Sequence, residues 1–220
     1  GIIMGLLRTI LALAVVFAHL PSGGFFVFVG GVHAVQLFYV ISGFLIAHVI
    51  AINENYKNPL KFYLNRALRL YPIYYAVAFL SLLSAILINQ KFFDLYMSIP
   101  VSADTLLILS NLFLFGQDWV MFSGIDDGHL VATSNFRVSE FRLHTGLLVP
   151  QAWTLGVELT FYILAPFVLR SKKLIFSLLV LSLSIKAYLF SIELGNRDPW
   201  SYRFFPAELS LFLLGALSNQ

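Results

Sequence analysis

The sequence predicts an all-α, polytopic integral-membrane helical bundle, and three observations support this fold class. Of the 220 residues, 59% are hydrophobic, and the mean hydropathy is +0.85. Only 11% are charged, whereas a soluble domain has about 25%. Six apolar stretches approach the ~20 residues with which a helix crosses a bilayer, at 2–20, 32–52, 71–89, 153–169, 174–194 and 204–219.

A seventh apolar stretch, Leu106–Phe115, is short for a span and predicts a re-entrant or interfacial segment. Basic residues cluster between the second and third spans and between the fourth and fifth, at Lys57, Lys61, Arg66, Arg69, Arg170, Lys172 and Lys173. The positive-inside rule then places the N-terminus and both clusters in the cytoplasm. The polar region 117–151 is mostly extracytoplasmic, and we expect residues 1–220 to form one membrane domain.

The composition also excludes several classes of partner and cofactor. The formal net charge is only +3, and no basic run alternates with stacking aromatic residues, so we expect no nucleic-acid partner. The absence of cysteine excludes a disulfide framework, thiolate metal sites and a cysteine nucleophile. Asp126, Asp127 and His129 give only a weak metal signal, so we expect no metal cofactor.

Arg8 and His19 lie inside the first apolar stretch, although an ionisable group in hydrocarbon costs several kcal/mol unless it faces protein or water. Their spacing is close to three helical turns, so both project from nearly the same face, roughly 16 Å apart along the axis. With the predicted topology, Arg8 lies in the cytoplasmic half of the span and His19 at its outer end. Snorkelling of Arg8 and an interfacial His19 are the structural alternatives.

Glu158 is a second intramembrane charge, near the outer end of the fourth span, and Tyr162 follows one turn later. The predicted depth of Glu158 is similar to that of His19. A carboxylate beside an imidazole fixes the tautomer of the imidazole and raises the basicity of the ring. A purely structural partner for an arginine or a backbone donor is the alternative.

Arg66 and Arg69 stand three residues apart, so they share one helix face if the third helix already begins there. Two guanidinium groups on one face suit bidentate binding of a phosphate. Ordinary anchoring at the inner membrane boundary is an equally simple explanation. Pro72, just beyond, suits an early helical position.

Other residues in the spans predict structural roles. Gly43 permits close approach of another helix or a substrate, and we favour packing because Ser42 has no nucleophile-elbow sequence around it. Lys186 and Glu208 occupy compatible depths on the last two spans, which predicts a structural ion pair.

Taken together, these residues resemble the integral-membrane acyltransferase 3 family, which includes O-acetylases of bacterial surface polysaccharides, Nod factors and peptidoglycan. The matching pieces occur in the family's order: Arg8 and His19 with ten residues between them, Leu37–Leu45, Arg66–Pro72, and Trp153–Glu158 followed by Phe161, Tyr162 and Pro166. The segment from Arg203 to Gly215 also looks like a later family segment. Members usually have about ten spans, so we expect this chain to be a C-terminally incomplete version of that fold.

The resemblance implies transfer of an acyl group, most simply acetyl, from cytoplasmic acyl-CoA to a hydroxyl of an extracytoplasmic or membrane-linked carbohydrate. It assigns Arg8 and His19 to the active centre, Arg66 and Arg69 to donor binding, and Glu158 to the family's tryptophan–glutamate motif. The implied location is a bacterial inner membrane.

Two other function classes stay open from the sequence. In a transporter or proton-coupled carrier, Arg8, His19 and Glu158 would form a relay or substrate site, although no inverted repeat is evident. A truncated, non-catalytic membrane subunit is the third interpretation.

Overall fold

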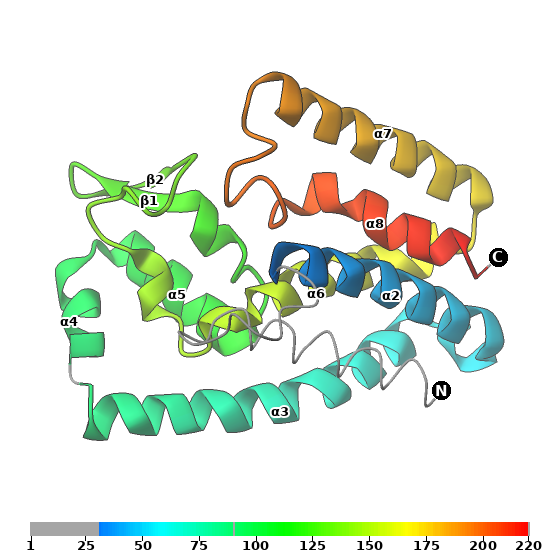
Figure 1. Ribbon diagram of the computed structural model, residues 1–220. Coiled ribbons are helices and arrows are strands. Elements are labelled where there is room, and N and C mark those ends of the chain that lie inside the picture. The colour runs from blue at the N-terminus through cyan, green and yellow to red at the C-terminus, as the bar shows by residue number, and fades with distance from the viewer. Residues whose placement is uncertain (1–30, 90, 220) are drawn as a thin grey trace, which may run out of the picture. The chain divides into compact units, whose positions relative to one another are not determined.

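The computed structural model describes residues 31–89 and 91–219, and this part of the chain is mostly helical (Figure 1). Arg8, His19 and the predicted span 2–20 therefore lie outside the described residues. The described chain divides into two compact units. Unit 1 comprises residues 31–58, 161–196 and 204–219, and unit 2 comprises residues 59–89, 91–160 and 197–203.

Among the described residues, three helices are long and apolar enough to cross a membrane: α2 (Gly31–Ile52), α3 (Pro59–Leu87) and α7 (Lys172–Ser191). Helices α6 (Trp153–Val168) and α8 (Phe205–Leu217) have 16 and 13 residues, so they rise only about 24 and 20 Å. The predicted helical fold with apolar helices long enough to span a membrane is thus confirmed, whereas the total of six spans stays a prediction.

Unit 1 is built on the close approach of α2 and α8, which run side by side in Figure 1. A Cβ atom on Gly43 of α2 would lie 1.8 Å from the carbonyl oxygen of Phe212. Likewise, a Cβ atom on Gly215 of α8 would lie 1.9 Å from the carbonyl oxygen of Val40. Because each glycine rests against the backbone of the other helix, the predicted packing role of Gly43 is confirmed.

Polar contacts join α7 to α8 within unit 1. The hydroxyl oxygen of Ser182 accepts a hydrogen bond from the backbone N–H of Ser210 at 2.8 Å. The Lys186 ammonium lies 2.8 Å from a carboxylate oxygen of the fully buried Glu208, and Gln36 of α2 donates to the other oxygen at 3.3 Å. The predicted ion pair between Lys186 and Glu208 is confirmed, and together with Gln36 it links α2, α7 and α8.

Unit 2 contains α3, α4 (Lys91–Ser98), α5 (Val101–Phe113) and the first half of α6. A short antiparallel hairpin of β1 (Ser123–Asp126) and β2 (His129–Ala132) follows α5, and Asp126 pairs with His129 across it. Single 3-10 turns occupy 119–122, 143–146 and 150–152. The hairpin adds a little sheet to the fold that the sequence predicts as all-α.

Three tyrosine hydroxyls of α3 satisfy the carbonyl groups at the end of α5. Tyr71, Tyr74 and Tyr75 donate to the carbonyl oxygens of Phe113, Asn111 and Leu112 at 2.5 to 2.6 Å. The last carbonyls of a helix have no partner within the helix, and an apolar environment makes that deficit costly. These hydrogen bonds therefore allow the short helix α5 to end against α3.

The early helical position predicted for Pro72 is wrong, because α3 begins at Pro59 and contains Pro72 in its interior. Pro59 occupies the first helical position, where its missing N–H has no consequence. The intervening segment 60–71 is rich in leucine, arginine, lysine and other residues that helices tolerate well. Arg66 and Arg69 consequently lie well inside a continuous helix.

Gly215→Ala is expected to destabilise unit 1 by about 1 to 3 kcal/mol, because the added methyl group forces α8 away from the backbone of α2. Thermal unfolding of the purified protein in detergent measures this loss. The matched control is Leu214→Ala, at a neighbouring exposed position that faces away from this contact. Equal unfolding temperatures for Gly215→Ala and wild type would contradict the close packing.

Candidate active site

Arg66 and Arg69 differ sharply in their surroundings, although both belong to α3. Arg66 is 7% exposed, and its guanidinium carbon lies 5.5 Å from the centre of the Phe62 ring. Its buried Nε atom has no hydrogen-bond partner among the described residues. Arg69 is exposed. A buried guanidinium with an unused donor is poised to receive an oxygen atom from a ligand.

Arg69 lines a small cavity of about 180 Å³ that both α3 and α6 border. Tyr74 contributes from α3, one to two turns after Arg69, and Leu155 contributes from α6. Leu155 precedes Glu158 by three residues, so it lies on a neighbouring turn of the same helix. The cavity therefore connects the exposed arginine of α3 with the helix that bears the predicted catalytic carboxylate.

Glu158 lies in α6 and is only 5% exposed. The residues around it on this helix are almost all apolar, as its sequence from Trp153 to Val168 shows. A carboxylate in such surroundings is retained only where other groups compensate its charge or where it serves a site. The predicted partner, His19, lies outside the described residues, so the pairing of Glu158 with His19 stays a prediction.

Asp118 is a buried carboxyl group that packs against α6 at Gly156. Its side chain is 2% exposed, and its Oδ1 atom has no hydrogen-bond partner among the described residues. A Cβ atom on Gly156 would lie 3.0 Å from this oxygen. Glycine at position 156, two residues before Glu158, therefore leaves the space that Asp118 occupies.

The neighbouring Gln117 is fully buried and connects the segment that bears Asp118 with α3. Its amide nitrogen donates to the Tyr74 hydroxyl at 2.9 Å and to the Ser110 carbonyl at 3.3 Å, while its amide oxygen has no partner among the described residues. Two neighbouring buried oxygens, one on Gln117 and one on Asp118, thus have no donor in the described part of the chain. Such atoms are rare in folded proteins and mark a place where a ligand, water or proton is held.

Burial raises the pKa of Asp118 from 3.8 to about 7, and the backbone N–H groups of Asp118 and Trp119 oppose this shift only in part. The charged carboxylate is disfavoured because it loses its hydration inside the protein. Near neutral pH Asp118 therefore exchanges a proton readily, which is the property expected of a general acid or base.

Arg203 organises a second cluster at the start of α6. Its guanidinium carbon lies 4.2 Å from the centre of the Trp153 ring and 4.7 Å from that of Tyr202. Asp198 forms ion pairs with Arg203 at 2.6 Å and with Arg137 at 2.9 Å. Segment 197–203 is thereby fixed to Trp153, the first residue of the helix that bears Glu158.

His144 lies beside this arginine cluster, in edge-to-face contact with the Phe136 ring at a centroid distance of 5.0 Å. Burial lowers the pKa of His144, and the positive charges of Arg203, Arg137 and Arg142 lower it further, whereas Asp198 opposes them. The imidazole is therefore uncharged at neutral pH. Its buried Nδ1 atom has no hydrogen-bond partner among the described residues.

The structure thus describes three of the five predicted site residues, and all three belong to unit 2. Sequence reasoning missed Asp118 and gave it no role. The usable signal was a Gln–Asp pair directly after an apolar helix too short to cross the bilayer. It also gave no separate role to Arg203, whose partners come from distant parts of the sequence.

Within the described residues, no group of three or more histidine, aspartate and glutamate side chains is arranged to bind a metal ion.

A protein-family model described as an acyltransferase domain matches residues 3–220. No curated protein and no solved structure gives a match.

Asp118→Asn is expected to remove a pH dependence of folding stability. Because the folded-state pKa is raised, the contribution of Asp118 is fully present below about pH 4 and is lost as pH rises through about 7. The neutral amide avoids that loss, so above neutral pH the variant is more stable than wild type, by up to about 4 kcal/mol.

Unfolding midpoints measured in detergent between about pH 5 and about pH 8 test this expectation. Asp126→Asn, the same change at an exposed position of the hairpin, is the control and keeps the wild-type profile. Parallel pH profiles for wild type and Asp118→Asn would contradict the assignment.

Proposed function

Because this chain belongs to the acyltransferase 3 family, we propose that it transfers an acetyl group from cytoplasmic acetyl-CoA to a hydroxyl of an extracytoplasmic or membrane-linked carbohydrate. Membership rests on the match over residues 3–220, and together with the long apolar helices it makes the protein a membrane acyltransferase. The donor, the acceptor and a bacterial inner-membrane location with a cytoplasmic N-terminus are the specific parts of the proposal.

The burial of Arg66 and Glu158 in a hydrophobic protein is the observation that supports this proposal best. The two side chains are 7% and 5% exposed and lie on α3 and α6. Burial of an ionisable group in apolar surroundings costs several kcal/mol unless other groups compensate its charge. The retention of two such groups therefore favours a functional site. The family match supports acyl transfer as the chemistry of the proposed site.

In the proposed donor site, Arg66 and Arg69 bind phosphate groups of acyl-CoA. The buried Nε atom of Arg66 has no partner among the described residues, so a phosphate oxygen would complete its hydrogen bonding. Arg69 is exposed and borders the cavity shared with α6, where it would meet the ligand from solvent. Arg8, predicted deeper in the membrane than these two residues, would guide the pantetheine arm toward His19.

In the proposed chemical step, His19 acts as general base and Glu158 orients its imidazole. The acceptor hydroxyl gives its proton to His19 while its oxygen attacks the thioester carbonyl carbon. The carbon–sulfur bond then breaks, and the departing CoA thiolate takes the proton from the imidazolium. An ester and free CoA result, and His19 returns to its neutral form. Transient acylation of His19 is a variant of the same route.

His19→Ala is expected to lower acyl transfer about 10²- to 10⁴-fold, because general-base assistance to the attacking hydroxyl is lost. Glu158→Gln preserves the shape of the side chain and removes its charge, and it is also expected to lower the rate of acyl transfer. The assay follows label from acetyl-CoA into membrane carbohydrate, with folded protein quantified by size exclusion. Glu140→Gln, an exposed loop change of the same type, is the control. Full transfer by folded His19→Ala would exclude the mechanism.

Replacing both Arg66 and Arg69 with glutamine is expected to raise the KM for acetyl-CoA by about tenfold, with a smaller effect on kcat, because charge-assisted bonds to phosphate are lost. Lys61→Gln removes one positive charge from an exposed position of the same helix and serves as the control. An unchanged KM in the double variant would remove both arginines from the donor site.

A further inference from the structure

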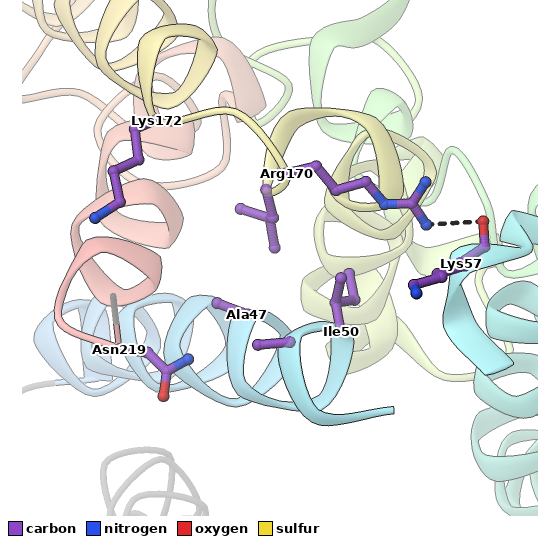
Figure 2. A pocket seen from close by; sticks show the side chains of 8 residues that line it. Ala47, Ile50, Lys57, Arg170, Lys172 and Asn219 are labelled. Atoms are coloured by element: carbon purple, nitrogen blue, oxygen red, sulfur yellow. Dashed lines mark hydrogen bonds between the residues drawn. The ribbon is translucent and has the colours of Figure 1, made fainter. Parts of the chain in front are cut away.

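A cavity of about 740 Å³ lies in unit 1, where the end of α2 meets the link between α6 and α7. Figure 2 shows Ala47 and Ile50 of α2 on one wall of this space. Leu169, directly after α6, adds a further apolar side chain. The volume is within the range of about 300 to 1,000 Å³ that is typical of small-molecule sites.

Three basic residues from three different segments surround the cavity. Figure 2 shows Lys172 of α7 on one side, and Arg170 and Lys57 on the opposite side. None of the eight described residues that line the space is acidic. The cavity therefore gathers positive charge around an apolar floor, which is the combination that an amphiphilic anion requires.

Arg170 is held in place without loss of its charge. Its guanidinium donates to the backbone carbonyl oxygens of Tyr56 at 2.7 Å and Lys57 at 2.9 Å, the latter drawn as a dashed line in Figure 2. Both acceptors are neutral, so they orient the group and leave its positive charge available. Lys57 contributes less charge, because it forms an exposed ion pair with Glu54.

Lys172 has no hydrogen bond or ion pair with any described residue, and it is exposed at the first position of α7. The N-terminus of a helix carries a partial positive charge, so a lysine there is electrostatically unfavourable. An anion bound between Lys172 and Arg170 would offset both charges.

We propose that this cavity binds a phosphate group. Phosphate oxygens accept hydrogen bonds from guanidinium and ammonium groups together, and the apolar wall suits the remainder of a larger ligand. Two sources share this chemistry: the nucleotide part of CoA, a possibility that rests on the proposed function, and the headgroup of an anionic phospholipid. The site is separate from the Arg66 and Arg69 pair, which belongs to unit 2.

The first arm of the test measures binding of adenosine 3′,5′-bisphosphate to the whole protein in a neutral detergent. Lys172→Gln and Arg170→Gln are each expected to weaken binding about tenfold. The matched control is Lys173→Gln, which removes the same charge from the next residue of α7 but does not line the cavity. Ala51→Trp fills the cavity without changing any charge, and it is expected to block binding.

The second arm places the protein in nanodiscs of phosphatidylcholine mixed with phosphatidylglycerol and measures retained phosphatidylglycerol by native mass spectrometry. The same variant pattern is expected here if the phosphate belongs to a lipid. Lys172→Gln is the decisive variant in both arms, because this lysine has no interaction among the described residues that folding would lose.

A Lys172-dependent signal in either arm supports the site and identifies the source of the phosphate. Absence of that dependence in both arms overturns the proposal, as does equal weakening by Lys173→Gln, which would show only diffuse attraction. Acetyl transfer is assayed on the same samples. Wild-type protein that binds the probe but transfers nothing would contradict the proposed function and leave the phosphate site in place.

Discussion

The inability of hydrocarbon to donate or accept hydrogen bonds is the constraint on which the rest of this structure depends. Where α5 ends, three tyrosine hydroxyls of α3 take the place of water at its last carbonyl groups. Where a carboxylate is fully buried, as at Glu208, an ammonium from α7 and an amide from α2 surround it. In both units, polar side chains of one helix thus provide the hydrogen-bond partners that groups of another helix lack.

Against this background, the exceptions are informative. The Nε atom of Arg66, the amide oxygen of Gln117 and one carboxyl oxygen of Asp118 are three of the five buried side-chain atoms that have no partner among the described residues. All three belong to unit 2, which also contains Glu158. A protein that supplies partners so consistently elsewhere would gain stability by filling these positions with apolar groups. Their retention favours a site at which substrate, solvent or protons complete the hydrogen bonding.

Sequence reasoning succeeded where a single local property decides the outcome. The helices near 32–52 and 174–194 follow from long, mostly apolar stretches, and the Lys186–Glu208 pair follows from two opposite charges at matching depth. It did not locate the start of α3 at Pro59, because the basic residues that suggest a membrane boundary are also good helix formers. Asp118 could not be placed, since its burial depends on the missing side chain of Gly156, far away in the sequence.

The reciprocal glycine contacts between α2 and α8 have a consequence for the biogenesis of the protein. Almost the entire described chain separates Gly43 from Gly215, although each glycine lies against the backbone of the other's helix. During synthesis α2 is therefore made long before the helix whose backbone Gly43 contacts in the folded protein. Unit 1 accordingly cannot be complete until residues 204–219 have been translated, and all the described residues of unit 2 precede them.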